Sequence, residues 1–145
     1  MKKGFTLVEL LAIIAILSII MLIGSYSITG VLNSFNKNAL ETKLDSILDA
    51  AIMYGQEKSS ELTSTCSVYN ETYNACKVLT VKVLLDTKFL ETKEKDGIYL
   101  NPVTKIDMAN DEVYVYRKNN RFYASIKDVK SCLDLETNEE ICNLE

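Results

Sequence analysis

The feature that most constrains this chain is a run of 27 residues without charge, from Leu10 to Asn36. About 20 apolar residues in a helix, at ~1.5 Å each, cross the ~30 Å hydrocarbon core of a membrane. Residues 5–28 are long enough for this and contain no proline. Lys2 and Lys3 precede them, and positive charge stays on the cytoplasmic side. The sequence therefore predicts a transmembrane helix over residues 5–28, with the N-terminus inside.

Glu9 is the residue that an ordinary export or anchor segment does not explain. It is the only acidic residue before Glu41. A carboxylate inside a membrane helix is costly and points to a functional role by default. The two alternatives are a secretory signal peptide, with residues 25–27 as its cleavage site, and a plain single-pass anchor. Neither is expected to carry Glu9. A lipoprotein anchor is excluded because the first cysteine is Cys66.

The segment around Glu9 also has a specific motif. A short basic leader is followed by Gly4-Phe5-Thr6-Leu7-Val8-Glu9-Leu10. This segment resembles the class III signal of type IV prepilins and pseudopilins, and the resemblance covers roughly the first 30 residues. It implies that Lys2 and Lys3 supply the leader charge, and that a membrane prepilin peptidase cleaves after Gly4 and methylates the new N-terminus at Phe5.

The same resemblance assigns Glu9 to subunit assembly, and physical chemistry agrees. Cleavage leaves a cationic amine on Phe5, one helical turn from Glu9. In a bundle of such helices, the Glu9 carboxylate of one subunit can pair with the Phe5 amine of its neighbour. An unpaired charge is costly in a low dielectric, so this pairing selects the axial register. The family often has a proline later in this helix. None is present here, and Gly24 or Gly30 would be the soft point instead.

The helix is predicted to continue beyond the membrane. Apolar residues recur at three- and four-residue spacing with charged residues between them, as in an amphipathic helix. This stripe consists of Leu40, Leu44, Ile47, Leu48, Ala51 and Ile52. The helix should end near Lys58, with Gly55 as the place where it frays or stops. The expected parts are a leader at 1–4, a transmembrane and polymerisation helix at 5–28, its amphipathic continuation at 29–58, and an extracytoplasmic globular head at 59–145.

The head shows short, mixed signals after a loop that follows the long helix. We expect a short helix around residues 78–91 and a short strand at 97–100. Two further strands are expected at 112–116 and 121–127, joined by a tight turn at 118–120 because asparagine tolerates positive φ. The predicted fold is α+β and pilin-like. In it, the long N-terminal helix packs against a small antiparallel sheet of three or four strands.

Four cysteines lie in the head, as Cys66 with Cys76 and Cys132 with Cys142. An even number outside the cytoplasm favours disulfides. Three pairings are open, and the two local ones, each ten residues apart, are favoured. Each loop closure would contribute about 3 kcal/mol on the chain-entropy model. Four free thiols are an alternative. A zinc site is a weaker one, because the chain has no histidine and no Cys-x-x-Cys spacing.

The composition argues against an enzyme. The chain has no histidine, and neither a nucleophile–base pair nor a phosphate loop appears, so we expect no catalytic activity and no cofactor. Asp107, Asn110 and Asp111 are weak calcium candidates, and a solvated acidic loop is the favoured interpretation. The net charge of −4 argues against broad nucleic-acid binding but leaves local basic patches open. Tyrosines cluster in the hairpin at 112–127, where an exposed set could bind a ligand or another subunit.

Together these features predict a structural subunit of a type IV pilus or pseudopilus. It would be a single-pass membrane protein before assembly and part of a surface filament afterwards. The expected partners are other pilin subunits, the prepilin peptidase, the membrane and the assembly ATPase with its platform. One alternative is a minor pilin whose head binds DNA, a surface or a secreted substrate. Another is a membrane-anchored protein that never polymerises. The sequence leaves open whether the system serves adhesion, competence or secretion.

Overall fold

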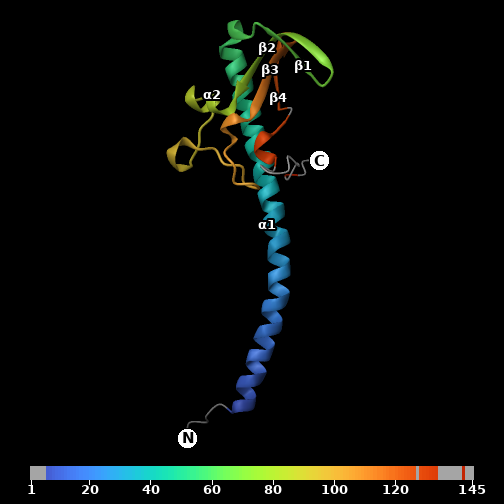
Figure 1. Cartoon of the computed structure of the whole chain (residues 1–145), viewed down its shortest axis with the longest axis vertical. Coiled ribbons are helices and arrows are strands. Elements are labelled where there is room, and N and C mark those ends of the chain that lie inside the picture. Colours follow the sequence, from blue (N-terminus) through green and yellow to red (C-terminus); the bar gives the residue numbers. More distant parts are fainter. Residues whose placement is uncertain (1–5, 127, 134–141, 143–145) are drawn as a thin grey trace. The chain divides into compact units, whose positions relative to one another are not determined.

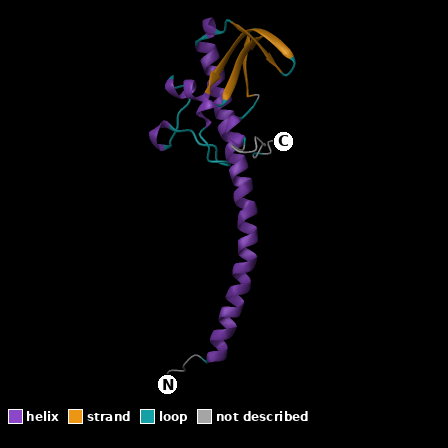
Figure 2. Ribbon diagram, in the orientation of Figure 1, coloured by secondary structure: helices purple, strands orange, loops and turns teal. Residues whose placement is uncertain are grey.

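The computed structural model describes residues 6–126, 128–133 and 142. Two helices and four strands make up this part of the chain (Figures 1 and 2). In chain order they are α1 (Leu7–Glu57), β1 (Ser64–Val68), β2 (Glu71–Thr80), α2 (Val81–Asp86), β3 (Glu112–Lys118) and β4 (Arg121–Ile126). The strands form one antiparallel sheet in the order β1-β2-β3-β4. The predicted α+β architecture, a long N-terminal helix packed with a small antiparallel sheet, is confirmed.

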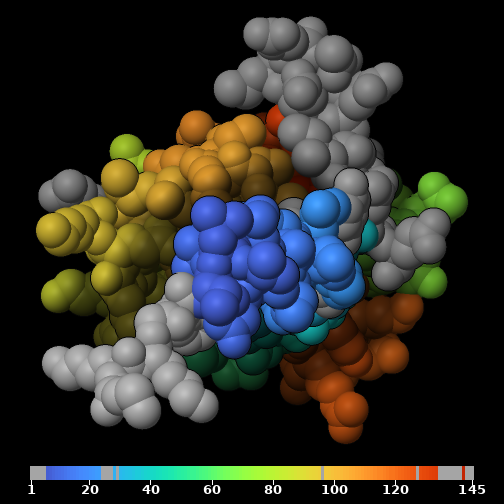
Figure 3. All heavy atoms as spheres, turned by 90° about the horizontal axis from the view of Figure 1, so that it is seen from below, coloured from blue at the N-terminus to red at the C-terminus, as the bar shows by residue number. Residues whose placement is uncertain are grey.

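The chain divides into two compact units, residues 1–36 and 37–145, and α1 belongs to both. In the first unit, the described apolar side chains of α1 are exposed, among them Leu7 at 75% and Ile23 at 69% (Figure 3, blue). Within the part of the chain that the structure describes, no helix combines the length and the hydropathy that crossing a membrane requires. The transmembrane helix over residues 5–28 therefore stays a prediction.

In the second unit, α1 supplies one wall of the hydrophobic core. Leu40, Ile47 and Ala51 from the predicted stripe are buried, and Leu44 and Leu48 are half-buried against the core. Two further buried residues, Ala50 and Tyr54, lie outside that stripe. The sheet supplies the facing wall through alternate residues of its strands. Those of β3 and β4 are Val113, Val115, Phe122 and Ala124.

Gly55 does not end the helix, contrary to the prediction. It lies inside α1, which ends at Glu57, and it is buried. A Cβ placed on Gly55 would lie 2.5 Å from Val115 Cγ1 and 3.2 Å from Phe122 Cδ1. The glycine is therefore explained by the close approach of helix and sheet rather than by backbone freedom at a helix terminus.

The turn between β3 and β4 is where the sequence placed it. Asn119 and Asn120 have φ values of 49° and 63°, as a two-residue hairpin turn of this type requires. As predicted, a short connection follows the long helix, over residues 58–63; beyond it, β1 and the first half of β2 form a second hairpin that was not predicted. Its turn residues, Tyr69 and Asn70, also have positive φ, of 48° and 65°. The hairpin was missed because its strands have few apolar residues to give an alternating pattern, and because tyrosine is not a usual turn residue.

Two other predicted elements differ in extent. The helix expected over 78–91 is limited to α2, because Val78 and Leu79 belong to β2 and pair with β3. The strand expected at 97–100 is absent among the described residues there. A 3-10 helix at Lys95–Gly97 and a single bridge between Leu100 and Asp107 take its place. The Leu100 backbone N–H donates to the Glu94 carboxylate at 2.7 Å, so a side chain uses the donor that a neighbouring strand would need.

The close contact at Gly55 yields a stability prediction. We expect Gly55→Ala to destabilise the head by about 1–3 kcal/mol through overpacking, despite the ~1 kcal/mol that alanine gains in helix propensity. Gly30→Ala is the matched control, since nothing lies within 4 Å of its Cβ position. Denaturant unfolding of the full chain measures both. Val115→Ala should restore stability to the Gly55→Ala chain, and an unaltered midpoint for Gly55→Ala would contradict the tight contact.

Candidate functional site

The first turn of α1 is held by Thr6 and Glu9. The backbone N–H and the hydroxyl of Thr6 donate to Glu9 Oε2 at 3.0 and 2.9 Å. The Glu9 backbone N–H donates in return to Thr6 Oγ1 at 3.4 Å. This reciprocal pair is a capping box, which satisfies backbone N–H groups that a helix start leaves without partners. Glu9 therefore has a structural role at the start of the helix.

Sequence reasoning missed the part played by Thr6. The signal was present, because Thr-x-x-Glu before an apolar run is the sequence pattern of a capping box. In the described residues, the hydrogen bonds to the Glu9 carboxylate all end on Oε2. The cap thus fixes the carboxylate at the end of the helix without engaging its second oxygen.

The side chains that follow the cap are apolar around the whole helix. Leu7, Val8, Leu10 and Leu11 are exposed, and the described apolar residues up to Ile23 are as well. A helix that is apolar all round needs apolar surroundings, in a membrane or among other helices. The other predicted site residues of this region, Lys2, Lys3, Gly4 and Phe5, lie outside the described residues.

The first 25 residues match the family described as the prokaryotic N-terminal methylation motif. This is the prepilin signal of type IV pilins and pseudopilins. No curated protein and no solved structure matches the chain. The motif supports a processed, type IV pilin- or pseudopilin-like subunit. The α+β fold, with its long N-terminal helix against a four-stranded antiparallel sheet, is consistent with the pilin fold.

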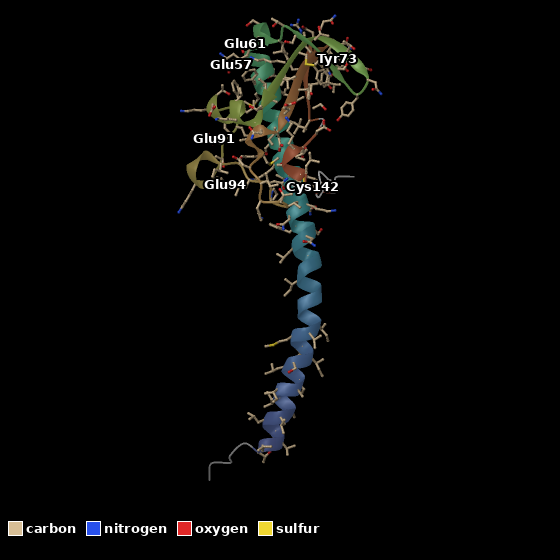
Figure 4. All side chains as sticks on the ribbon, in the orientation of Figure 1. Glu57, Glu61, Tyr73, Glu91, Glu94 and Cys142 are labelled. Carbon is tan, nitrogen blue, oxygen red and sulfur yellow. A yellow bond between two sulfur atoms is a disulfide. The ribbon has the colours of Figure 1, made fainter. Side chains whose placement is uncertain are left out.

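Two disulfides brace the pilin-like head. The first joins Cys66 in β1 to Cys76 in β2, and the second joins Cys132 to Cys142. Their Cα atoms are 5.9 and 5.3 Å apart. These are the two local pairs, and no cysteine is left free. The first staples the β1–β2 hairpin, and the second ties Cys142 (Figure 4) to the end of the folded core.

A buried polar network surrounds the second disulfide. The Ser131 backbone N–H and hydroxyl donate to the Asp111 carboxylate at 2.8 and 2.7 Å. The side-chain amide of Asn101 donates to Ser131 Oγ at 3.2 Å and contacts the sulfurs of Cys132 and Cys142 at 3.3 and 3.5 Å. Asn101, Asp111 and Ser131 are all buried. Such a network orients its members because each buried polar group needs its partner.

The three calcium candidates do not converge on one site. Asp107 Oδ1 accepts from the backbone N–H of Ala109 at 3.0 Å and so caps a 3-10 helix at Met108–Asn110. Asp111 is buried against Ser131, and Asn110 is exposed. Among the residues with described side chains, no three histidine, cysteine or acidic side chains gather as a metal site would require. The two aspartates instead serve to hold the loop before β3.

Burial of Asp111 makes head stability depend on pH. Desolvation raises the pKa of this carboxyl above its ordinary 3.8, and the hydrogen bonds from Ser131 offset only part of the effect. The folded protein therefore keeps this proton to a higher pH than the unfolded chain does. The resulting stabilisation is complete below pH 3.8 and is lost as pH rises through the raised pKa.

We predict that Asp111→Asn removes this component, because the amide is neutral at every pH. The free energy of unfolding of the original protein, minus that of the variant, should fall between pH 3.5 and pH 7. Denaturant titrations of both full-length chains at several pH values measure it. The other carboxylates contribute equally to both proteins and cancel in the difference. A difference that stays constant or rises with pH would show that desolvation does not dominate at Asp111.

Proposed function

We propose that this chain is a structural subunit of a type IV pilus or pseudopilus. In this proposal a prepilin peptidase removes residues 1–4 and methylates Phe5, and the mature chain polymerises through the helix over residues 5–28. The observation that carries the proposal is the prepilin signal at residues 1–25, which includes the first turns of α1. An assembly ATPase and its platform, which are separate proteins, would move the subunits.

The exposed apolar surface of α1 supports this role. Before assembly, the segment over residues 5–28 would lie in the membrane, with Lys2 and Lys3 on the cytoplasmic side. After processing, the same side chains would pack against the helices of neighbouring subunits. Either environment removes from water the apolar side chains from Leu7 to Ile23 that are exposed in the single chain.

The capping box supports a specific register contact. Because Thr6 engages Glu9 Oε2, the second carboxylate oxygen can accept a hydrogen bond from the Phe5 amine of a neighbouring subunit. Helix capping and subunit pairing can then operate together at one carboxylate. Glu9 can cap the helix in a monomeric anchor too. Only a polymerising subunit would also supply a cationic partner for its charge, and on this ground we favour polymerisation over the non-polymerising alternative.

The register contact predicts different outcomes for two neighbouring substitutions. Glu9→Gln keeps an oxygen acceptor suited to the capping box but removes the charge. We therefore expect normal processing but at least tenfold less subunit in sheared filaments. A tenfold loss is equivalent to about 1.4 kcal/mol of pairing free energy. Thr6→Ala removes the hydroxyl of the cap but keeps the charge, and it should still enter filaments. Immunoblots of sheared and cell-associated fractions measure both. Normal filaments containing the Glu9→Gln chain would refute the pairing.

Processing gives an independent prediction. Gly4→Val places a branched side chain beside the proposed cleavage site, and we expect it to leave the precursor uncut. Intact-mass measurement of the membrane fraction should then find the full chain, starting at Met1 or Lys2. Gly30→Ala, which lies along α1 away from the cleavage site and outside the matched residues 1–25, serves as the control and should be cut normally. A mature N-terminus at Phe5 in the Gly4→Val chain would contradict the assignment.

A further inference from the structure

The face of the sheet opposite α1 carries a pocket that the proposed filament role does not use. Its volume is about 360 Å³, within the range typical of small-molecule sites. The wall comes from Tyr114 of β3 and Ser125 of β4, which are register partners. The β1–β2 hairpin supplies the rest: Ser67, Val68, Tyr69 and Asn70. The turn of that hairpin therefore folds over the sheet and encloses the space.

Ser125 leaves a hydrogen-bonding group unsatisfied at this pocket. Its side chain is 5% exposed, and Oγ has no hydrogen-bond partner among the described residues. Buried hydroxyls are nearly always paired, because an unpaired one loses its bonds to water. Oγ itself is covered in this side-chain conformation, so a rotation about χ1 would have to turn it into the pocket, where a ligand hydroxyl would supply the missing partner.

Tyr69 stands at the rim of the pocket in an unfavourable backbone conformation. Its φ of 48° is uncommon for a bulky side chain, and the residue is 79% exposed. At the equivalent position of the β3–β4 turn, where φ is 49°, the residue is Asn119. An exposed aromatic ring in place of the favoured asparagine weakens the turn, and such local strain is typical of functional sites.

A row of stacked tyrosines continues the surface beside the pocket. The ring centroids of Tyr73 and Tyr116 are 4.3 Å apart, and those of Tyr116 and Tyr123 are 5.8 Å apart. Tyr116 and Tyr123 form the register pair next to Tyr114 and Ser125 on the same face. Figure 4 shows Tyr73 beside the strands of the head. The pocket therefore opens beside a flat aromatic platform.

The chemistry of the lining selects the class of ligand. Among the described residues, hydroxyl, amide, phenol and one valine side chain line the pocket, with no acid or base. Lys118 and Glu71, two charged residues at the tyrosine row, pair with each other at 2.6 Å. Nucleic acid would need cations in the lining to meet its phosphates. A neutral polyhydroxylated ring needs what is present: rings to pack its C–H faces and several short polar groups for its hydroxyls.

We infer that this pocket binds a neutral saccharide. The ring packs between Tyr69 and Tyr114, and its hydroxyls bond to Ser125 Oγ and to the polar side chains of Ser67 and Asn70. The inference does not depend on the filament role, because every contributing residue lies in the unit of residues 37–145.

Saturation-transfer NMR on the purified full chain tests it. The detergent must be zwitterionic, since an alkyl glycoside would present its own sugar to the pocket. The probes are lactose, maltose and N,N′-diacetylchitobiose, with an oligothymidylate and a neutral tetrapeptide for comparison. We expect saturation of the ring protons of at least one saccharide. No signal from any saccharide, or binding of only the oligonucleotide or the peptide, overturns the inference.

Two variants separate binding from folding. Ser125→Ala should weaken saccharide binding about three- to tenfold, the loss of one hydrogen bond, while the melting temperature stays the same or rises. Tyr69→Asn should weaken it at least tenfold, since it removes the ring, and should raise the melting temperature because asparagine suits the turn. Asn119→Gly, in the other turn, is the matched control and should leave affinity unchanged. Unchanged affinity in both pocket variants overturns the assignment of the site.

Discussion

The approach of α1 to the sheet at Gly55 is the contact on which the rest of the head depends. A four-stranded sheet needs one face covered, and a head of this size has little other material to cover it. With no side chain at Gly55, Val115 and Phe122 come directly against the helix. At that spacing Tyr54 reaches the ring of Phe89, with centroids 5.4 Å apart, and its hydroxyl accepts from Lys77 Nζ at 2.9 Å. Helix, sheet and the segment after α2 are thereby joined in one core.

Covering one face of the sheet leaves the other free for different chemistry. Alternation along β3 sends Val113 and Val115 to the helix and Tyr114 and Tyr116 to the opposite side. The Cys66–Cys76 disulfide holds the β1–β2 hairpin, whose turn encloses the pocket on that side. The head thus has one sheet face that packs against the helix and another that carries the pocket for which we propose a ligand. The first face is stabilised by apolar burial, while the second carries a strained turn and an unpaired hydroxyl.

The N-terminal unit differs from the head in the exposure of its apolar side chains. Its described apolar side chains are exposed in the single chain, and in the proposed filament role lipid or neighbouring subunits would cover them. Thr6 and Glu9 cap the helix where a processed chain would begin. One carboxylate can therefore start the helix and carry the charge that an assembled bundle must match. In the proposed filament, the Phe5 amine of a neighbouring subunit would match this charge beside the long apolar run.

The sequence alone determined the features that depend on local pattern. These are the prepilin signal with Glu9, the extent of α1, the α+β class and the asparagine turn at 119–120, because motif, periodicity and turn chemistry are properties of neighbouring residues. Tertiary structure decided the rest. Gly55 was assigned to a helix end because its real constraint, Val115, lies far away in the chain. The β1–β2 hairpin escaped prediction because its pairing and its disulfide, not its propensities, hold Tyr69 in place. The pocket at Ser125 exists only because that hairpin folds back over β3 and β4, a long-range contact that no local pattern encodes.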